Sequence, residues 1–595
     1  MENNTMTGLK RTHYCGELRT NNIGEKVVVC GFTQRARNLG TLQFIDLRDR
    51  TGILQLAFDD NTERELFELA KTVRSEFVIM AEGTVRERES KNYDIPTGEI
   101  EIDVTDLRIL SKAQTPPFEI VENSTVKDEL RLKYRYLDLR RADLQQNIIK
   151  RHKIVKSARD YFDKNGFIEV ETPILIKSTP EGARDFLVPS RIHDGKFYAL
   201  PQSPQLYKQL LMVSGFDRYV QFARCFRDED LRADRQPEFT QIDLEMSYVD
   251  VDDVMQIGEG FIQHLFREVM DIDIELPLRR MTYKEAMEKY GSDKPDVRFG
   301  YEIEDLTDIV KDCDFTVFKS AAETGSVRAI CVEGGANAYS RKELDKLTEQ
   351  VRGIGGKGLA WIKVTEEGIQ STFSKFMKDE EMQAIVSRMN AKAGDIIFVV
   401  ADGKNKIVLS VLGMLRLECA KKMNVIDNNK WCFLWITEFP FFEWDEDLNT
   451  YVAMHHPFTS PMAEDIDKLD TDKGNVRAKA YDLVLNGIEL SSGSIRITDP
   501  VLQKKMFTAL GLSDEESYQK FGFLTDAFTY GAPPHGGMGL GLDRLVMLML
   551  GAESLRDVIA FPKVQNMMEL MTECPSLVDE VQLGELHIAL NKTEK

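Results

Sequence analysis

The stretch Phe226-Arg-Asp-Glu-Asp230, followed by Pro237-Glu-Phe-Thr-Gln-Ile-Asp243, decides how this chain is interpreted. An apolar strand runs into a loop rich in arginine and carboxylates, and the second segment resumes as a strand. The guanidinium of Arg227 can hold a phosphate through two parallel hydrogen bonds. The carboxylate of Glu229 can accept from a purine amino group, and the ring of Phe239 can stack on the base. These residues predict an ATP site without a P-loop.

The second half of this site lies about 300 residues later, in Gly539-Leu-Gly-Leu-Asp-Arg544, where glycines allow the backbone to approach a ligand. The two segments resemble motifs 2 and 3 of class II aminoacyl-tRNA synthetases. Nearly the whole chain resembles the bacterial-type aspartyl-tRNA synthetases. Taken alone, the charged loop after Phe226 is as typical of a solvated surface loop as of a nucleotide site. The resemblance implies an ATP-dependent, AMP-forming ligase that joins L-aspartate to tRNA(Asp).

The resemblance assigns a role in ATP binding to each matching residue. It places Arg227 at the α-phosphate and Arg544 at the γ-phosphate, as the two catalytic cations. It also implies that ATP contacts Glu229, Gln236, Phe239 and Glu489. It places Mg²⁺ at Asp482 and Glu489, and hard oxygen ligands suit that ion. Taken alone, either acid is as typical of an exposed helix face as of a metal site.

The loop Leu200-Pro-Gln-Ser-Pro-Gln-Leu-Tyr-Lys208 opens a predicted helix and resembles the aspartate-specific loop of the family. Lys208 and Arg496 supply positive charge for the substrate's side-chain carboxylate. Two buried cations would reject asparagine, whose amide leaves a charge unpaired. The remaining residues implied at aspartate are Gln205 and Asp243 on the ammonium side, Ser203, and Glu181 and His455 on two closing loops.

One segment departs from the family pattern. Ser491 and Ser492 stand where the family usually has glycines, ahead of Gly493-Ser-Ile-Arg496. Their side chains occupy a place where backbone approaches substrate. The departure predicts an altered local geometry in the pocket and an unaltered reaction.

Composition restricts the class of protein. With 595 residues, 42% hydrophobic and 29% charged, the chain is predicted to be globular and multi-domain. The net charge of -21 argues against a general nucleic-acid coat, while a local basic stretch such as Leu130–Arg141 could still face tRNA. Eight scattered cysteines without a Cys-x-x-Cys pair argue against zinc and disulfides and favour the cytoplasm. The chain has no apolar run long enough to span a bilayer, and its N-terminus has no signal-peptide pattern, so we expect no membrane association.

The N-terminal region predicts a small β-barrel. Five short apolar or alternating segments, with one helix over Thr62–Val73 between the third and fourth, suit an OB-fold. Arg35, Arg37, Phe44 and Gln55 are expected to be exposed on its RNA-reading face. A core position for Phe44 is the alternative. The family resemblance places the tRNA anticodon at Arg37, Phe44, Gln55 and Glu101.

The predicted fold class is multi-domain α+β. The expected segments are an OB-fold anticodon-binding domain (1–112), a hinge (113–142), a class II antiparallel-sheet catalytic domain in two parts (143–285 and 426–562), an α+β insertion domain (286–425) and a C-terminal extension (563–595). A long amphipathic helix followed by Gly166–Pro173 resembles motif 1, which implies a homodimer.

Three other interpretations conflict with particular residues of the sequence. Gly353-Ile-Gly-Gly-Lys-Gly358 matches the dinucleotide fingerprint, but a helical segment precedes it and a strand follows, the reverse of what that motif needs. An asparagine or lysine enzyme of the same class conflicts with the Gln-Ser-Pro-Gln-Leu-Tyr-Lys loop and the insertion. A non-enzymatic RNA-binding module conflicts with the intact ATP residues. Whether tRNA(Asn) is also charged depends on a few barrel contacts and stays open.

Overall fold

The computed structural model describes residues 5–179, 182–230, 235–446 and 449–591. The chain divides into two compact units. The first consists of Met1–His152, Leu231–Gln236 and Leu550–Val578, and the second of Lys153–Asp230, Pro237–Met549 and Asp579–Lys595. Within the described ranges, no helix is both long and apolar enough to cross a bilayer.

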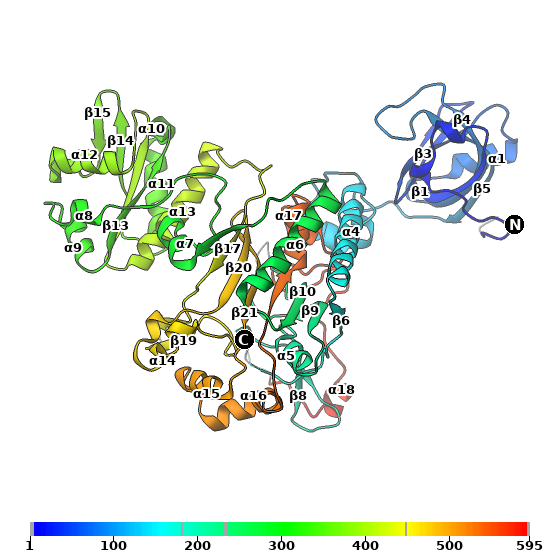
Figure 1. The fold of residues 1–595 in the computed structure, drawn as a ribbon. Helices are drawn as coiled ribbons and strands as arrows, with labels where there is room; N and C mark the ends of the chain where they lie inside the picture. The colour runs from blue at the N-terminus through cyan, green and yellow to red at the C-terminus, as the bar shows by residue number, and fades with distance from the viewer. Residues whose placement is uncertain (1–4, 180–181, 231–234, 447–448, 592–595) are drawn as a thin grey trace. The chain divides into compact units, whose positions relative to one another are not determined.

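The first unit contains a closed barrel in the order β1-β2-β3-β5-β4 (Figure 1). Its strands are β1 (Lys26–Asn38), β2 (Gln43–Asp49), β3 (Gly52–Phe58), β4 (Val78–Glu87) and β5 (Ile100–Ser111), with α1 (Arg64–Thr72) between β3 and β4. Closure comes from the parallel pair β3–β5, and the other neighbours are antiparallel. Alternating apolar residues of all five strands fill the interior. The prediction of an OB-fold barrel is confirmed.

The basic stretch Leu130–Arg141 is only partly exposed, so it does not form one continuous basic face, and a role towards tRNA stays a prediction. It folds as α2 (Asp128–Lys133) and α3 (Arg135–Asp138), just before α4 (Ala142–Lys164). Arg135 and Arg141 are buried and both pair with the fully buried Asp138, at 2.8 and 3.0 Å. Because buried charges need partners, these two arginines serve the fold.

The second unit is organised around a sheet in the order β11-β17-β20-β21-β22-β10-β9-β6. The bounds are β6 (Ile168–Glu169), β9 (Arg218–Phe226), β10 (Glu238–Ser247), β11 (Arg279–Thr282), β17 (Phe433–Thr437), β20 (Ala480–Leu485), β21 (Ile488–Ile495) and β22 (His535–Gly541). The inner strands are antiparallel, as predicted, whereas the short edge strands β11 and β6 pair in parallel. The sheet is therefore mixed.

Helices pack against this sheet and position its site. Contacts join α5 (Gln205–Val213) to β9 and β10, α6 (Val251–Met270) to β22, and α17 (Leu542–Met549) to β10. On α6, Gly258 lies against the side chains of Trp435 and Met538, where a Cβ would come within 3.2 Å of both. The neighbouring Glu259 accepts a hydrogen bond from the Trp435 indole at 3.1 Å. This close packing fixes α6 on the sheet.

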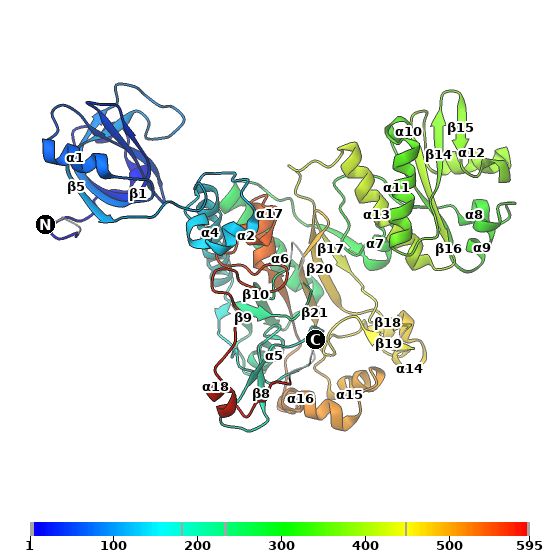
Figure 2. The same cartoon turned by 180° about the vertical axis from the view of Figure 1, so that it is seen from behind.

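A smaller sheet, β12-β13-β16-β14-β15, forms within the predicted insertion. Its strands are β12 (Glu304–Asp305), β13 (Ser326–Val332), β14 (Ala360–Thr365), β15 (Gly368–Ser371) and β16 (Ile396–Asp402). Figure 2 shows α11 (Arg341–Gly353) and α13 (Asn405–Met423) on one side and α8 (Thr307–Val310), α9 (Thr316–Thr324) and α12 (Asp379–Arg388) on the other. Two apolar cores fill the two faces. The glycine-rich segment lies between α11 and β14, the helix-to-strand order that argued against a dinucleotide site.

The rest of the second unit completes the surroundings of the sheet. Its other elements are β7 (Leu187–Pro189), β8 (Phe197–Ala199), α7 (Tyr283–Tyr290), α10 (Gly335–Ala338), β18 (Phe442–Asp445), β19 (Thr450–Ala453), α14 (Lys468–Thr471), α15 (Pro500–Ala509), α16 (Asp514–Phe528) and α18 (Glu580–Glu585). Among them, α16 packs on α5 and on α15. These contacts support α5, which carries Lys208.

Candidate active site

Arg227 lies just past the end of β9, in the connection to β10. Its backbone N–H donates to the Pro237 carbonyl at 2.8 Å, which closes the base of the connection. The guanidinium carbon lies 5.1 Å from the ring centroid of Phe239. Its Nε is buried and has no hydrogen-bond partner among the described residues. The aromatic ring therefore orients a cation with a donor left for a ligand. Glu229 follows on the same connection.

The glycines of the second motif let β22 lie close against β10. Asp243 pairs with Gly539 and Gln241 with Gly541 in the register of the two strands. A Cβ at Gly539 would lie 2.2 Å from the side-chain nitrogen of Gln241 and would displace that side chain, and a Cβ at Gly537 would lie 2.1 Å from the Leu244 carbonyl oxygen, where no larger residue fits. Arg544 follows in the first turn of α17 and donates to the Glu489 carbonyl at 2.6 Å. The fold thus holds Arg544 next to one of the predicted metal-binding acids.

Asp482 and Glu489 lie on the adjacent antiparallel strands β20 and β21, not on a helix face. Burial, together with the negative charge of Glu489, raises the pKa of Asp482 well above its ordinary value. The Oδ1 atom of Asp482 is buried and has no partner within the described part of the chain. Two neighbouring carboxylates with an unsatisfied buried oxygen fit a hard divalent cation. No group of three or more potential ligands of the His, Cys, Asp or Glu type occurs in the described ranges.

Lys208 is the centre of the predicted aspartate pocket. Only 2% of its side chain is exposed, and its Nζ lies 2.9 Å from Asp243 and 3.3 Å from Glu245. It projects from α5, while both acids lie on β10. An ammonium buried this deeply is held by its two acidic neighbours.

Arg496 approaches the same acids from the end of β21. Its Nε and Nη2 donate to the two oxygens of Glu245, at 2.8 and 3.0 Å. Its Nη1 contacts His456 at 2.7 Å and Ser494 at 2.5 Å. Glu245 therefore joins the two cations that were predicted to select aspartate. Sequence reasoning missed Glu245, although its position two residues after Asp243 puts it on the same face of the strand.

The two acids of this cluster titrate in opposite directions. Burial raises the pKa of Asp243 to about 6, although Lys208 opposes the shift. Burial alone would raise the pKa of Glu245 as well, but Arg496 and Lys208 outweigh it and hold that pKa at about 2. Burial and the same two cations lower the pKa of His456 well below its usual range, so this imidazole stays neutral.

Two buried polar atoms in the pocket remain without a partner among the described residues: Asp243 Oδ1 and Gln205 Nε2. Leaving such groups unpaired costs on the order of 1–3 kcal/mol each, so a ligand that pairs with them gains binding free energy. An anionic acceptor and an amide donor that are both unpaired fit the ammonium and carboxylate of an amino acid. Both residues were predicted to hold the substrate there.

The other three residues predicted at aspartate, Ser203, His455 and Glu181, differ in their surroundings. Ser203 is half-buried just ahead of α5. His455 packs edge-on against Phe439, with ring centroids 5.4 Å apart, and burial lowers its pKa to about 4. Its neighbour His456 is the histidine that contacts Arg496. Glu181 lies outside the described residues.

Gln236, which was predicted to bind ATP, belongs to the first unit. Its side chain donates to the Lys563 carbonyl at 3.1 Å and accepts from the Lys563 amide at 2.8 Å. These two bonds account for the side-chain amide in this structure. The role in ATP binding stays a prediction.

The serines that replace the usual glycines both lie on β21. Ser491 is buried, and its hydroxyl has no partner in the described ranges. Ser492 is exposed and faces Asp482 across the strand pair, where its hydroxyl favours the ionised carboxylate. Gly493 cannot be replaced in this way, because a Cβ there would lie 2.4 Å from the Gly537 carbonyl.

The four residues predicted at the anticodon form one chain of contacts on the barrel. Arg37 lies over Phe44 at 5.8 Å and donates to Gln55 at 3.0 Å, and Gln55 donates to Glu101 at 2.7 Å. Gln55, which was expected to be exposed, is buried at 5% exposure because it is held between these partners. Glu101 also pairs with Arg86 at 2.8 Å. Phe44 is half-buried and does not belong to the barrel core.

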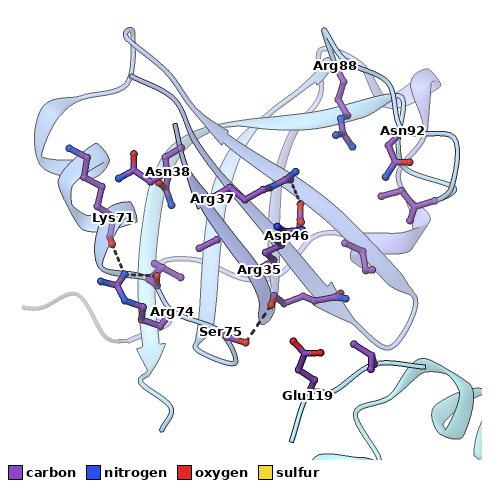
Figure 3. Close-up of a pocket in the computed structure, with 17 residues that line it drawn as sticks. Arg35, Arg37, Asn38, Asp46, Lys71, Arg74, Ser75, Arg88, Asn92 and Glu119 are labelled. Atoms are coloured by element: carbon purple, nitrogen blue, oxygen red, sulfur yellow. Dashed lines mark hydrogen bonds and ion pairs between the residues drawn. The ribbon is translucent and has the colours of Figure 1, made fainter. Parts of the chain in front are cut away.

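A cavity of about 1020 Å³ opens beside this chain of contacts (Figure 3). Arg35 and Arg37 line it, as do Arg88 and Asn92 of the connection after β4, which sequence reasoning did not single out. Arg37 pairs there with Asp46 at 2.8 Å. Phe44, Gln55 and Glu101 are not among the lining residues. Basic and amide side chains around an open cavity suit single-stranded RNA.

Comparison with known proteins agrees with the fold. The profile described as tRNA synthetases class II (D, K and N) matches residues 127–565, and that of the OB-fold nucleic acid binding domain matches residues 27–110. An aspartate–tRNA ligase from Ruminiclostridium cellulolyticum is 60% identical, over 98% of this chain and 99% of the relative. An aspartate–tRNA(Asp/Asn) ligase from Caldanaerobacter subterraneus is 56% identical, over 98% and 99%.

A solved structure shares the architecture at low sequence identity. The crystal structure of asparaginyl-tRNA synthetase from Pyrococcus horikoshii complexed with asparaginyl-adenylate has a TM-score of 0.58 and 19% identity, covering 93% of this chain and 98% of that one. At this identity the likeness concerns the fold alone.

The chain therefore belongs to the class II tRNA synthetases of the D, K and N group. Within that class it is a member of the bacterial-type aspartate–tRNA ligases, and it is an enzyme. The predicted family, fold class and activity are confirmed, and the readings as a lysine or asparagine enzyme or a non-enzymatic module are set aside.

The raised pKa of Asp243 predicts a pH dependence of aspartate binding. Below about pH 6 this carboxyl is protonated and no longer attracts an ammonium, so the KM for aspartate should rise as the pH falls through 6. The pKa of Asp243 in the folded protein lies above its ordinary value, so ionising this carboxyl destabilises the fold. This destabilisation grows as the pH rises from the ordinary pKa to about 6. Pyrophosphate exchange measured across this range should show the inflection, and Asp243→Asn should remove it. A wild-type KM that is flat through pH 6 contradicts the assignment.

Proposed function

We propose that this protein condenses L-aspartate with ATP to give aspartyl-adenylate and pyrophosphate, and then transfers the aspartyl group to the 3′-terminal ribose of tRNA(Asp). The observation that carries the proposal is the buried cluster of Lys208, Arg496, Asp243 and Glu245. It places two cations beside one acid that has an unpaired oxygen. A side-chain carboxylate fits the cations, and an α-ammonium fits Asp243.

The reaction requires two anions to approach each other, because a carboxylate attacks the α-phosphorus of ATP. Arg227, braced by Phe239, neutralises the α-phosphate. Arg544 binds the γ-phosphate end, and Glu229 accepts from the adenine amino group. Asp482 and Glu489 would hold Mg²⁺ with the phosphates as its other ligands, and this ion would supply further neutralisation of phosphate charge. We assign aspartate contacts to Ser203 and, on two closing loops, to Glu181 and His455.

The amino-acid specificity is tested by aspartate-, asparagine- and lysine-dependent exchange of pyrophosphate into ATP without tRNA. Only aspartate should support exchange, since the two cations leave a charge unpaired when the ligand side chain is neutral. Exchange that is faster with asparagine would refute the proposal. Exchange with none of the three would indicate a protein without activation chemistry.

A second candidate function concerns the range of tRNAs. Some close relatives are named aspartate–tRNA ligases and others aspartate–tRNA(Asp/Asn) ligases. The difference has to lie in how the barrel reads an anticodon base, which we assign to Arg37, Phe44, Gln55 and Glu101. Aspartylation of purified tRNA(Asp) and tRNA(Asn), compared through kcat/KM, distinguishes the two. Equal values establish the wider specificity, and a difference of several orders of magnitude establishes the narrower one.

We also propose that the enzyme is a homodimer in the cytoplasm, with the segments 1–112, 143–285, 286–425 and 426–562 acting as the domains predicted above. The edge strand β6 supports the dimer, because Ile168 on it is 49% exposed and Ile174 and Leu175 just beyond it are 49% and 52% exposed. An apolar sheet edge is a surface that proteins usually cover. The scattered cysteines, without a Cys-x-x-Cys pair, suit a reducing compartment.

Charged substitution at the β6 edge should separate the protomers. Ile168→Glu is expected to convert the dimer to monomer and to lower aspartate activation in parallel, because the segment after β6 leads towards the aspartate loop. Val317→Glu, at a similarly exposed apolar residue (52%) on α9 of the predicted insertion, introduces the same charge and should change neither property. Sedimentation velocity and pyrophosphate exchange on the same samples provide the two readings. A wild-type protein that sediments as a fully active monomer contradicts the proposal.

A further inference from the structure

A second cavity of the first unit has no role in the functions proposed so far. Its volume is about 350 Å³. Four arginines and two aromatic rings dominate its lining: Arg11, Tyr14, Phe32, Arg48, Arg50 and Arg140. Such a concentration of arginine is unusual in a chain of net charge -21. It indicates an anionic ligand.

The four arginines fall into two pairs. Arg48 and Arg140 share one carboxylate, Glu76, at 2.9 and 2.8 Å, and Arg140 also stacks on Phe32 at 4.0 Å. These contacts fix the inner wall of the cavity. They leave the pair with one more positive charge than its acid neutralises.

Arg11 and Arg50 form the outer pair and are exposed. Both lie over the ring of Tyr14, at 3.9 and 4.8 Å, and Arg50 also donates to the Tyr14 hydroxyl at 3.2 Å. Neither forms an ion pair with a carboxylate anywhere in the described ranges. Tyr14 thus holds two unneutralised guanidinium groups at the mouth of the cavity.

This cavity and the larger one of Figure 3 lie along the same pair of strands. The larger one uses residues 34–38 of β1 with Gln43 and Asp46 of β2, and the smaller one uses residues 30–32 and 48–49. At ~3.3 Å per residue, the six residues from Gly31 to Arg37 separate the two by about 20 Å. One extended polyanion can therefore reach both.

We propose that the cavity around Tyr14 binds backbone phosphates of the tRNA whose unpaired bases occupy the larger cavity. The inference rests on the tRNA substrate of the proposed function. The arginines supply charge and forked donors without a base-reading pattern, which is the chemistry of backbone contacts. Both aromatic rings are already covered by arginine, so no base can stack there.

The test replaces the two unneutralised cations in the full-length enzyme, as Arg11→Gln with Arg50→Gln. The Kd for tRNA(Asp) should rise about tenfold at moderate salt, and the slope of log Kd against log salt should fall by roughly 1.4–1.8, which corresponds to two lost phosphate contacts. Aspartate-dependent pyrophosphate exchange needs no tRNA and should be unchanged. A variant with Arg11→Gln and Arg50→Lys keeps the positive charge at position 50, so it should bind tRNA(Asp) more tightly than the double glutamine variant. Arg64→Gln removes an exposed arginine that lines neither cavity and should change nothing.

Each outcome decides between the alternatives. An unchanged tRNA Kd and salt slope in the double variant overturns the inference, whether or not exchange is intact. If inorganic pyrophosphate binds the wild type at this cavity while the tRNA Kd of the double variant stays unchanged, the site serves a free anion and the inference also fails. Wild-type enzyme without aspartate-dependent exchange would instead refute the proposed function, and the tRNA measurements would still decide whether the cavity binds RNA.

Discussion

Replacing Arg227 with alanine is expected to lower aspartyl-adenylate formation by about 10²–10³, the usual effect of removing one preorganised donor at a reacting centre, or ~2.7–4 kcal/mol. The effect should fall on kcat, because charge on the α-phosphate develops most in the transition state. Arg544→Ala should lose a similar amount, with more of it in the KM for ATP. The fold should survive the change at Arg227, since its Nε has no partner in the described part of the protein. Arg544→Ala removes one hydrogen bond to the Glu489 carbonyl, so its stability is measured alongside.

Single-turnover adenylate formation and thermal unfolding of the same preparations measure the two properties. Arg267→Ala is the matched control, because that arginine is exposed on α6 and pairs with Asp273 at the surface. Pyrophosphate exchange within tenfold of wild type in either site variant would refute the assignment of that arginine.

Lys208→Met should abolish aspartate selection and also destabilise the protein. The lysine is buried against Asp243 and Glu245, so its loss leaves uncompensated charge in the interior, which costs about 3–5 kcal/mol in comparable buried pairs. Truncating one member of such a pair also costs about 2–5 kcal/mol in ligand binding. Activity alone therefore does not separate misfolding from loss of recognition.

A second substitution separates the two effects. Lys208→Met combined with Asp243→Asn removes both charges of the pair, so most of the stability should return while aspartate binding stays lost. Lys479→Met is the control, because that lysine pairs with the exposed Asp250 and lies outside the pocket. Urea unfolding and the KM for aspartate and for asparagine give the readings. If the double variant binds aspartate as wild type does, Lys208 has only a structural role.

The sequence predicted this architecture well where local pattern and family motif agreed. The barrel strands, the helix α1 and the helix-to-strand order around Gly353 all follow from residue periodicity. The strand character of Asp482 and Glu489 was not evident, because short acidic segments suit either an exposed helix or a buried strand that binds a cation.

Contacts between distant residues account for what sequence reasoning missed. Glu245 could have been expected from alternation on β10, but its two partners come from α5 and from the end of β21. The burial of Gln55 depends on Arg37 and Glu101, which lie on neighbouring strands of the closed barrel. Arg135 and Arg141 read as a basic face until the position of Asp138 is known. In each case a polar residue is buried because a partner remote in sequence satisfies it.

The pairing of β10 with β22 has a consequence for how the enzyme is made. Asp243 and Gly539 are direct neighbours in the sheet although about 300 residues separate them along the chain. A ribosome adding roughly 5–20 residues per second therefore spends many seconds between the two strands. During that interval the emerging β10 lacks the partner that carries Arg544, and one edge of it is open. Prematurely terminated chains would lack the complete nucleotide site and could not consume ATP. They would still expose an unpaired strand to aggregation or to chaperones.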